Sequence, residues 1–443
     1  MALFYKIFIT TYPCLDEGIP FGLTWPVDES SFCLTARGAF GTAMHPDNYK
    51  ELSDLSLIRS KMEQKDVTDL KDHVENLTMQ KFALKYNQNT INMQSYFLIV
   101  FAFFYIATGL SVPEEIENQF QLGPEDIRLL NSNLYVLDDD HNLVSLTTDL
   151  LNAEVNTESE RDTMMDLHNR VYFYLYTTNN RIYPDAISIN DLESLKKSNF
   201  NFNRPTRIIT HGWMNSHNSD SCILIRDAYL NQGDYNIIVI DWSKISINSY
   251  LWTSRRVKMI GQYVSTMLNF LEKEGMDLST TTMVGHSLGA HVVGLAARYA
   301  KGTVNYVIGL DPALPGFNGA KIGSRISQGD ANYVEIIHTN GGILGYLNSI
   351  GDVDFYPNGG IRQAGCIIDV GGACSHLRAY QFFAESINSK VGFHAKKCNS
   401  YWRYKLGLCN KKLSLIMGGR KKHFTVKGVF YLDTNAFSPF ARG

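Results

Sequence analysis

The segment from Thr280 to Ala300 constrains the fold of this chain more than any other. A short β-branched run, Thr280 to Val284, predicts a strand, and the Ala-rich run from Ala290 to Ala300 has the 3.6-residue periodicity of a helix. Between them lies Gly285-His286-Ser287-Leu288-Gly289, a Gly-x-Ser-x-Gly motif. A serine on a tight strand-to-helix turn is exposed above a sheet, and glycines two residues to either side remove Cβ atoms that would clash there. These surroundings favour a nucleophile elbow over a Gly-rich turn with an ordinary serine.

Strand and helix patterns alternate through the second half of the chain. The expected strands are 171–176, 206–210, 236–240, 280–284, 304–310 and 333–339, and a long amphipathic helix covers about 254–274. This alternation predicts a doubly wound, mostly parallel sheet whose ligands bind beyond the carboxyl ends of the strands. Only 67 residues follow His376, which is too few for a substantial additional domain.

Composition excludes some functions and leaves one open. A hydrophobic content of 44% supports a sizeable core, and a net charge of -3 argues against a nucleic-acid-binding protein. Charge is unevenly placed, however: from Ser386 to Tyr431 there are eleven Lys or Arg residues and no Asp or Glu. This segment is either a solvated basic face or a surface attracted to anionic lipid headgroups. We favour the solvated face, because sequence order does not establish a cluster in space.

The first part of the chain differs from the rest. Residues 1–92 have no clear periodicity, and the run 96–107 is twelve consecutive apolar residues followed by small ones. Such a run is typical of a signal peptide and is short for a bilayer span of about 20 residues. We therefore expect Met93 to be the true start, with a signal anchor as the alternative. The expected division is an extension of unknown status at 1–92, a signal-peptide-like segment at 93–111, an N-terminal arm or propeptide at 112–165, and the catalytic domain at 166–443.

A nucleophilic serine needs a base and an acid that orients the base. In α/β-hydrolases these follow the serine in the order acid, then histidine. Asp311 is the first acid that follows an expected strand after Ser287, although Asp-Pro is also a common turn dipeptide. The candidate bases downstream are His338, His376, His394 and His423. We favour His376, which lies in a loop leading into a helical stretch, whereas His338 closes an apolar run and is also interpretable as a core histidine.

Five motifs resemble those of the pancreatic lipase family, and the resemblance runs from about Val171 to Gly443. They are Thr210-His211-Gly212-Trp213, Gly285 to His291, Gly309-Leu310-Asp311-Pro312-Ala313, Asp354 to Gly360, and Cys374 to Ala379. The resemblance implies an α/β-hydrolase fold, here a single catalytic domain without a C-terminal β-sandwich. It implies that Ser287, Asp311 and His376 form a catalytic triad. It also implies an oxyanion hole made by the backbone N–H groups of Leu288 and Trp213.

The cysteines carry further implications of the resemblance. Cys366 and Cys374 enclose seven residues and match the disulfide that closes the family's lid. This lid is far shorter than in triglyceride lipases, and the second covering loop, 340–350, is short as well, as in the phospholipases A1 of insect venoms. Cys398 and Cys409 resemble a second family pair. If residues 1–92 are absent, Cys222 is left over; if they are present, either Cys14 or Cys33 is available to pair with it.

The chain also departs from the digestive members of the family. Ile322 and Ser327 stand where two calcium-binding carboxylates would be, leaving Asp330 near Arg325. One carboxylate is a poor site for a cation that prefers six to eight oxygen ligands. We therefore expect no metal, no cofactor and no calcium requirement. Without the β-sandwich domain, we also expect no colipase partner, and we expect a monomer.

The sequence therefore predicts a secreted lipid ester hydrolase, most consistent with a phospholipase A1 that releases the sn-1 fatty acid at a membrane or micelle interface. One alternative is a triacylglycerol or galactolipid lipase. The other is a catalytically inert lipid-binding or yolk-type relative. Such relatives typically lose the nucleophile, which this chain retains.

Overall fold

The computed structural model describes residues 133–146, 158–409, 413–419 and 425–443, together with three short N-terminal strands. Those strands, β1 (Thr11–Pro13), β2 (Leu23–Trp25) and β3 (Phe32–Leu34), form an antiparallel sheet in the order β1-β3-β2. The chain divides into two compact units, Met1–Val112 and Pro113–Gly443. The signal-peptide-like segment 93–111 lies outside the described residues. Within those residues, no helix has both the length and the apolar character needed to cross a membrane.

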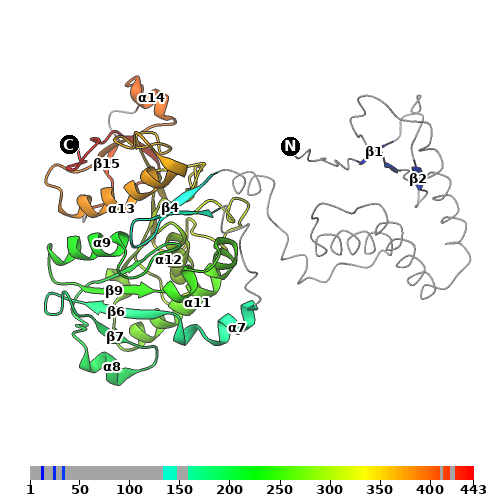
Figure 1. Cartoon of the computed structure of the whole chain (residues 1–443). Helices are drawn as coiled ribbons and strands as arrows, with labels where there is room; N and C mark the ends of the chain where they lie inside the picture. The colour runs from blue at the N-terminus through cyan, green and yellow to red at the C-terminus, as the bar shows by residue number, and fades with distance from the viewer. Residues whose placement is uncertain are drawn as a thin grey trace, which may run out of the picture. The chain divides into compact units, whose positions relative to one another are not determined.

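An eleven-stranded sheet is the centre of the second unit (Figure 1). From one edge to the other it contains β15 (Ser414–Ile416), β14 (His394–Lys397), β16 (Gly428–Leu432), β13 (Val353–Pro357), β12 (Tyr333–Ile337), β11 (Tyr306–Leu310), β10 (Thr282–His286), β8 (Thr206–Thr210), β9 (Asn236–Asp241), β6 (Tyr172–Tyr176) and β7 (Asp185–Ile187). The strands from β16 to β9 are parallel, and the outer strands at both edges pair antiparallel. The predicted doubly wound, mostly parallel sheet is confirmed.

Helices cover both faces of this sheet. The larger ones are α9 (Asp220–Leu230), α11 (Tyr250–Lys273), α12 (Leu288–Tyr299) and α13 (Ala373–Asn388). The shorter ones are α7 (Glu160–Met165), α8 (Leu192–Lys197), α10 (Ser243–Ser246), α14 (Tyr401–Lys405) and the 3-10 turns η2 (Leu167–Asn169), η3 (Leu278–Thr280) and η4 (Val370–Gly372). Apolar residues of α11 and α12 form one core, and those of α9 and α13 form the other.

The central strands supply side chains to both cores. Ile208 and Ile238 belong to the core under α11 and α12, whereas Ile209 and Ile237 belong to the core under α9 and α13. Successive side chains of a strand point to opposite faces, so a strand covered on both faces needs apolar residues at every position. This explains why the runs that predicted these strands are apolar without interruption.

At two of the element boundaries that differ from the sequence-based prediction, a local hydrogen bond explains the difference. Thr280 ends the turn η3 rather than opening a strand, because the Asp277 carboxylate accepts the N–H of Ser279 at 2.8 Å and stabilises that turn. β12 ends at Ile337 rather than Thr339, because the N–H of Thr339 donates to the Asp311 carboxylate instead of to a neighbouring strand.

An N-terminal hairpin packs onto this unit. Its strands are β4 (Tyr135–Leu137) and β5 (Leu143–Ser145), and the flanking Leu134 and Leu146 are buried in the core shared with α11 and α12. The hairpin also bonds the loop after β8, where Asn215 Nδ2 donates to the carbonyl of Leu137 at 3.2 Å. The described part of the segment expected to be an arm or propeptide is therefore integrated into the fold.

Because Leu146 is fully buried, we expect Leu146→Ala to lower the free energy of unfolding by about 2–5 kcal/mol. Leu143→Ala is the matched control in the same hairpin, since Leu143 is half exposed, and we expect it to cost under about 1 kcal/mol. Urea denaturation of both variants measures the difference. Equal, small effects would show that the hairpin does not contribute to the stability of the domain.

Candidate active site

The turn between β10 and α12 holds Ser287 in a strained conformation. Its φ is 57° and its ψ is -123°, a region that non-glycine residues rarely adopt. The two flanking glycines make the turn possible: a Cβ on Gly285 would lie 2.1 Å from the carbonyl oxygen of Gly289, and one on Gly289 would lie 2.3 Å from that of His211. The sequence therefore forms an elbow that holds the serine at the carboxyl end of β10.

Asp311 follows β11, the strand next to β10, and its carboxylate is buried and fully engaged. One oxygen, Oδ1, accepts the backbone N–H groups of Thr339 at 2.8 Å and Asn340 at 3.0 Å. The other, Oδ2, accepts Nδ1–H of His376 at 2.6 Å. His376 lies in the first turn of α13, and its position is thereby fixed relative to the end of β11.

The remaining ring nitrogen of His376, Nε2, is free to accept a proton. Because Nδ1 donates to Asp311, Nε2 carries the lone pair that can accept a proton. Nε2 is buried and has no hydrogen-bond partner among the described residues, so the bond to Ser287 Oγ is not formed in this structure. Catalytic hydrogen bonds of this kind often become short only when substrate is bound.

The loop after β8 lies against the serine. A Cβ on Gly212 would lie 2.9 Å from Cβ of Ser287. His211 Nδ1 donates to the carbonyl oxygen of Gly212 at 2.9 Å, and its Nε2 accepts the backbone N–H of Trp242 at 3.1 Å. In a trans peptide the N–H points away from the C=O, so His211 fixes the direction of the Trp213 N–H. Leu288 is the first residue of α12, and its N–H has no partner within the helix.

Asp241 supports this loop from behind. It lies at the end of β9, with Oδ1 3.5 Å from His211 Nε2 and Oδ2 hydrogen-bonded to Nδ1 of His217. Burial favours a raised pKa for Asp241, but the neighbouring His211 and His217 rings outweigh it and hold the pKa well below its usual range. The network keeps a charged carboxylate next to His211, and no sequence motif indicated it beyond the position of Asp241 after a buried strand.

The other candidate bases are placed elsewhere. His338 is buried with Nε2 2.9 Å from Oδ1 of Asp354 and Nδ1 2.6 Å from the carbonyl oxygen of Tyr346, so neither nitrogen is available. His394 is exposed on β14, and His423 lies outside the described residues. Of the described candidates, only His376 is joined to Asp311.

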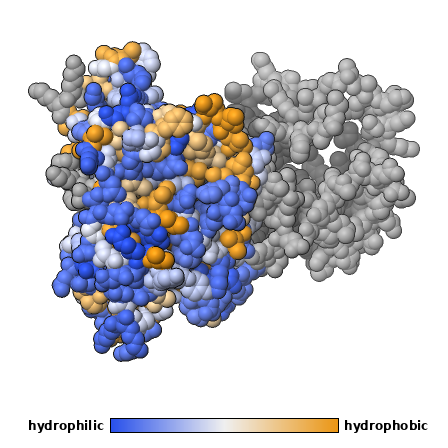
Figure 2. Space-filling view, turned by 60° about the vertical axis from the view of Figure 1, so that its left-hand side comes forward, coloured by the Kyte–Doolittle hydropathy of each residue, from blue (hydrophilic) through white to orange (hydrophobic). Residues whose placement is uncertain are grey.

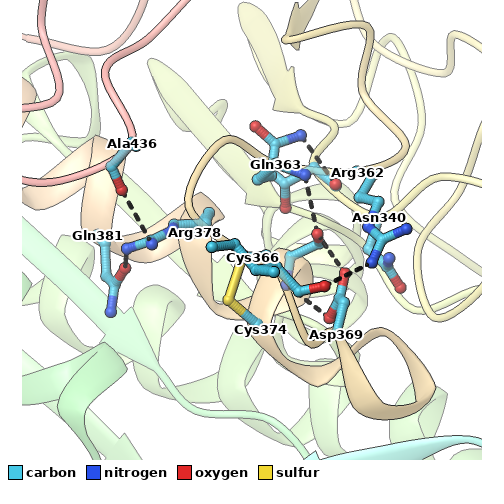
Figure 3. The surroundings of a disulfide bond; sticks show 12 residues. Asn340, Arg362, Gln363, Cys366, Asp369, Cys374, Arg378, Gln381 and Ala436 are labelled. Carbon is cyan, nitrogen blue, oxygen red and sulfur yellow. Dashed lines mark hydrogen bonds between the residues drawn. A yellow bond between two sulfur atoms is a disulfide. The ribbon is translucent and has the colours of Figure 1, made fainter.

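A disulfide between Cys366 and Cys374 closes the segment before His376 (Figure 3). Inside it, Asp369 accepts the N–H of Ser375 at 3.2 Å and its hydroxyl at 2.5 Å. Ser375 Oγ in turn accepts the N–H of Gln363 at 2.9 Å. These bonds fix the base of the loop next to His376, and they show why an aspartate and a serine stand at those positions.

The tip of this loop is apolar and exposed. Ile367 and Ile368 are 84% and 83% exposed. On its other side the loop lies against the N-terminal hairpin, because a Cβ on Gly371 would lie 2.5 Å from the backbone nitrogen of Tyr135. The second expected disulfide, Cys398–Cys409, is also formed, and Cys222 is buried and unpaired. Burial raises the pKa of Cys222 to about 12, which keeps it a thiol.

The segment around Arg325 and Asp330, where the sequence predicts no calcium site, is held by hydrogen bonds to protein groups. Asp330 is buried, with Oδ1 accepting Nε of Arg298 at 2.5 Å and Oδ2 accepting the N–H of Ser327 at 2.7 Å. Arg325 donates to the carbonyl of Ile326. Both carboxylate oxygens of Asp330 are therefore occupied by protein donors, and the described residues contain no group of three or more acidic, His or Cys side chains suited to a metal.

Two further buried histidines are neutral and make stability depend on pH. Burial lowers the pKa of His291 to about 3 and, together with the nearby His376, holds that of His286 well below its usual value. Unfolding lets both rings take up protons below pH about 6.5. We therefore expect the free energy of unfolding to fall between pH 7 and pH 5, by up to about 1.4 kcal/mol per pH unit for each ring.

Urea denaturation across this pH range measures the slope. His394→Gln is the control, because His394 is exposed, and we expect it to leave the slope unchanged. His291→Gln removes one of the two buried rings and is expected to flatten the slope. A free energy of unfolding that does not vary with pH would contradict the assignment of neutral buried rings.

Comparison with known proteins agrees with this fold. A family model described as Lipase matches residues 142–440. Pancreatic triacylglycerol lipase of Mus musculus is 32% identical over 306 residues, and that of Homo sapiens is 33% identical over 304 residues. Pancreatic lipase-related protein 2 of Rattus norvegicus is 34% identical over 301 residues. Each alignment covers 61% of this chain and 64% of the relative, so the chain spans less than two thirds of the length of these proteins. The match over 142–440 shows that the chain belongs to the lipase family, the family of the pancreatic lipases.

Proposed function

We propose that this chain hydrolyses carboxylic esters of lipids, with Ser287 as nucleophile, His376 as base and Asp311 as the group that orients the base. The observation that carries the proposal is the 2.6 Å hydrogen bond from His376 Nδ1 to Asp311 Oδ2, which leaves Nε2 free. The ring of His376 lies 4.5 Å from that of His286, the residue that precedes Ser287 in the strained elbow. The membership in the lipase family supports the same reaction class.

The chemistry is acyl transfer in two steps. Ser287 Oγ attacks the ester carbonyl while Nε2 of His376 takes its proton, and the resulting imidazolium is stabilised by the Asp311 carboxylate. When the tetrahedral intermediate collapses, the C–O bond to the alcohol breaks and His376 returns the proton to that leaving group. Water then attacks the acyl-enzyme, again losing its proton to His376, and the fatty acid leaves as Ser287 is restored.

The negative charge on the tetrahedral oxygen requires donors that are in place beforehand. The N–H of Leu288, at the start of α12, and that of Trp213, directed by His211, are the proposed pair. One such donor contributes about 3 kcal/mol to the transition state. The start of a helix adds a favourable partial positive charge at the same place.

The substrate we propose is a phospholipid cleaved at the sn-1 position. Only seven residues lie between Cys366 and Cys374, and a small lid covers less of the site and leaves room for a polar headgroup. Two of the relatives named above are pancreatic triacylglycerol lipases, which makes triglyceride the second candidate. The two disulfides support a secreted protein, because such bonds persist in oxidising compartments.

Hydrolysis of a phosphatidylcholine labelled differently at its two acyl chains tests the function, with a triolein emulsion assayed in parallel. We expect release of the sn-1 chain, a loss of at least about a thousandfold in Ser287→Ala, and no effect of a chelator. Cleavage of triolein alone would keep the triad and contradict the phospholipid assignment. Ser287-independent activity, or none on either lipid, would overturn the proposed function.

A second prediction concerns His211, which acts through the peptide that it holds. We expect His211→Leu to lower kcat about tenfold to a thousandfold on a soluble short-chain ester, with KM nearly unchanged, because the Trp213 N–H is then no longer directed at the oxyanion. His211→Asn is the matched variant, since its side-chain amide can still donate to Gly212 and is expected to retain more of kcat. A raised KM with unchanged kcat would show that His211 shapes binding instead.

A further inference from the structure

One edge of the large sheet ends in a small lobe that the proposed reaction does not use. We call residues 394–409 and 413–416 the edge lobe; it contains β14, α14 and β15 and is closed by the Cys398–Cys409 disulfide. In Figure 1 the helix α14 projects from the top of this unit. The lobe lies within the segment 386–431, which has eleven basic residues and no acidic one.

The lobe exposes large apolar side chains to solvent. Trp402 in α14 is 68% exposed, and Leu406 and Leu408 directly after the helix are each 53% exposed. Figure 2 shows hydrophobic and hydrophilic residues side by side at the top of the coloured unit, where this lobe lies. Exposed apolar residues scattered singly are ordinary, but an exposed tryptophan and two exposed leucines within seven consecutive residues are typical of an interaction surface.

Two exposed cations of the lobe have no acidic partner among the described residues. Lys396 on β14 and Arg403 on α14 are exposed, and neither forms an ion pair with a described residue. Lys405, by contrast, is bound to the carboxylate of Asp433 at 2.8 Å. An anionic surface would therefore meet cations that no protein carboxylate neutralises.

The lobe lies at the same end of the sheet as the candidate active site. Tyr401 packs against Gly359, two residues after β13, and its hydroxyl donates to Asp433 at 2.8 Å, just after β16. Both positions follow the carboxyl ends of parallel strands, as do Ser287 and Asp311. A flat lipid surface that touched the lobe would thus also face the exposed tip of the lid.

We propose that the edge lobe docks the enzyme onto lipid surfaces that carry anionic headgroups. Trp402, Leu406 and Leu408 enter the headgroup region, and Lys396 and Arg403 bind the anionic groups above them. A sulfated polysaccharide would pair with the cations but would leave the apolar side chains without a partner, so the combination favours a lipid. The inference rests on the proposed function, because it names the surface on which the substrate is met.

Vesicle binding by the full chain tests the proposal. Ser287→Ala serves as the parent protein, so the vesicles stay intact and the result does not depend on activity. We expect stronger binding to phosphatidylcholine vesicles containing phosphatidylserine than to phosphatidylcholine alone, and weaker binding at high salt.

Lys396→Ala and Arg403→Ala are each expected to weaken binding about fivefold, the equivalent of about 1 kcal/mol. Trp402→Ala is expected to weaken it on both kinds of vesicle.

Matched controls come from outside the edge lobe. Tyr183, between β6 and β7, is a highly exposed aromatic residue, and Lys301 is an exposed cation, and we expect alanine at either position to leave binding unchanged. The difference in emission between the parent and Trp402→Phe reports on Trp402, and we expect that emission to shift to shorter wavelength on vesicles.

The outcomes separate the two proposals. Vesicle binding that depends on Trp402 and Arg403 in a protein without esterase activity would sustain the docking surface and overturn the proposed function. Full esterase activity with binding that ignores the lobe variants would overturn the docking surface alone. Binding to heparin, lost in Arg403→Ala but not in Trp402→Ala and without vesicle binding, would assign the lobe to a polysaccharide and overturn the lipid proposal.

Discussion

The carboxylate of Asp311 is the interaction on which the arrangement of the site depends. It lies at the end of β11 and joins that strand to two other segments: the loop after β12 through Thr339 and Asn340, and the helix α13 through His376. A buried carboxylate is costly unless its oxygens are hydrogen-bonded, so moving any of these donors away from Asp311 would destabilise the folded state. The end of β12, the entry into α13 and the orientation of the imidazole therefore follow from one side chain.

Much of this arrangement can be predicted from the sequence. Central strands covered on both faces need apolar residues at every position. The unbroken apolar runs that contain Ile208-Ile209 and Ile237 to Ile240 therefore predict buried strands, as the structure shows. The elbow was equally well specified, since Gly285 and Gly289 each meet backbone where a Cβ would stand. The family resemblance, rather than chemistry alone, selected His376 among several histidines.

Other parts depend on contacts between distant residues, which no local pattern records. His338 and Asp354 form a buried His–carboxylate pair that looks in sequence like another candidate for catalysis, and only the carbonyl of Tyr346 on the second ring nitrogen shows that it is structural. The edge strands β14 and β15 are short, and half of their residues face solvent, so periodicity did not indicate them. The support of His211 by Asp241 joins two strand ends whose adjacency the sequence order does not give.

The N-terminal hairpin has a consequence for the order in which the molecule folds. Its strands β4 and β5 are synthesised early, but Tyr135 packs against Gly371. In the sequence, Gly371 follows every strand of the large sheet except β14, β15 and β16. Contacts between residues so distant along the chain form late, because the intervening loop must first be closed. Leu134 and Leu146 therefore remain in contact with water, or with whatever shields nascent chains, until the rest of the domain has been translated.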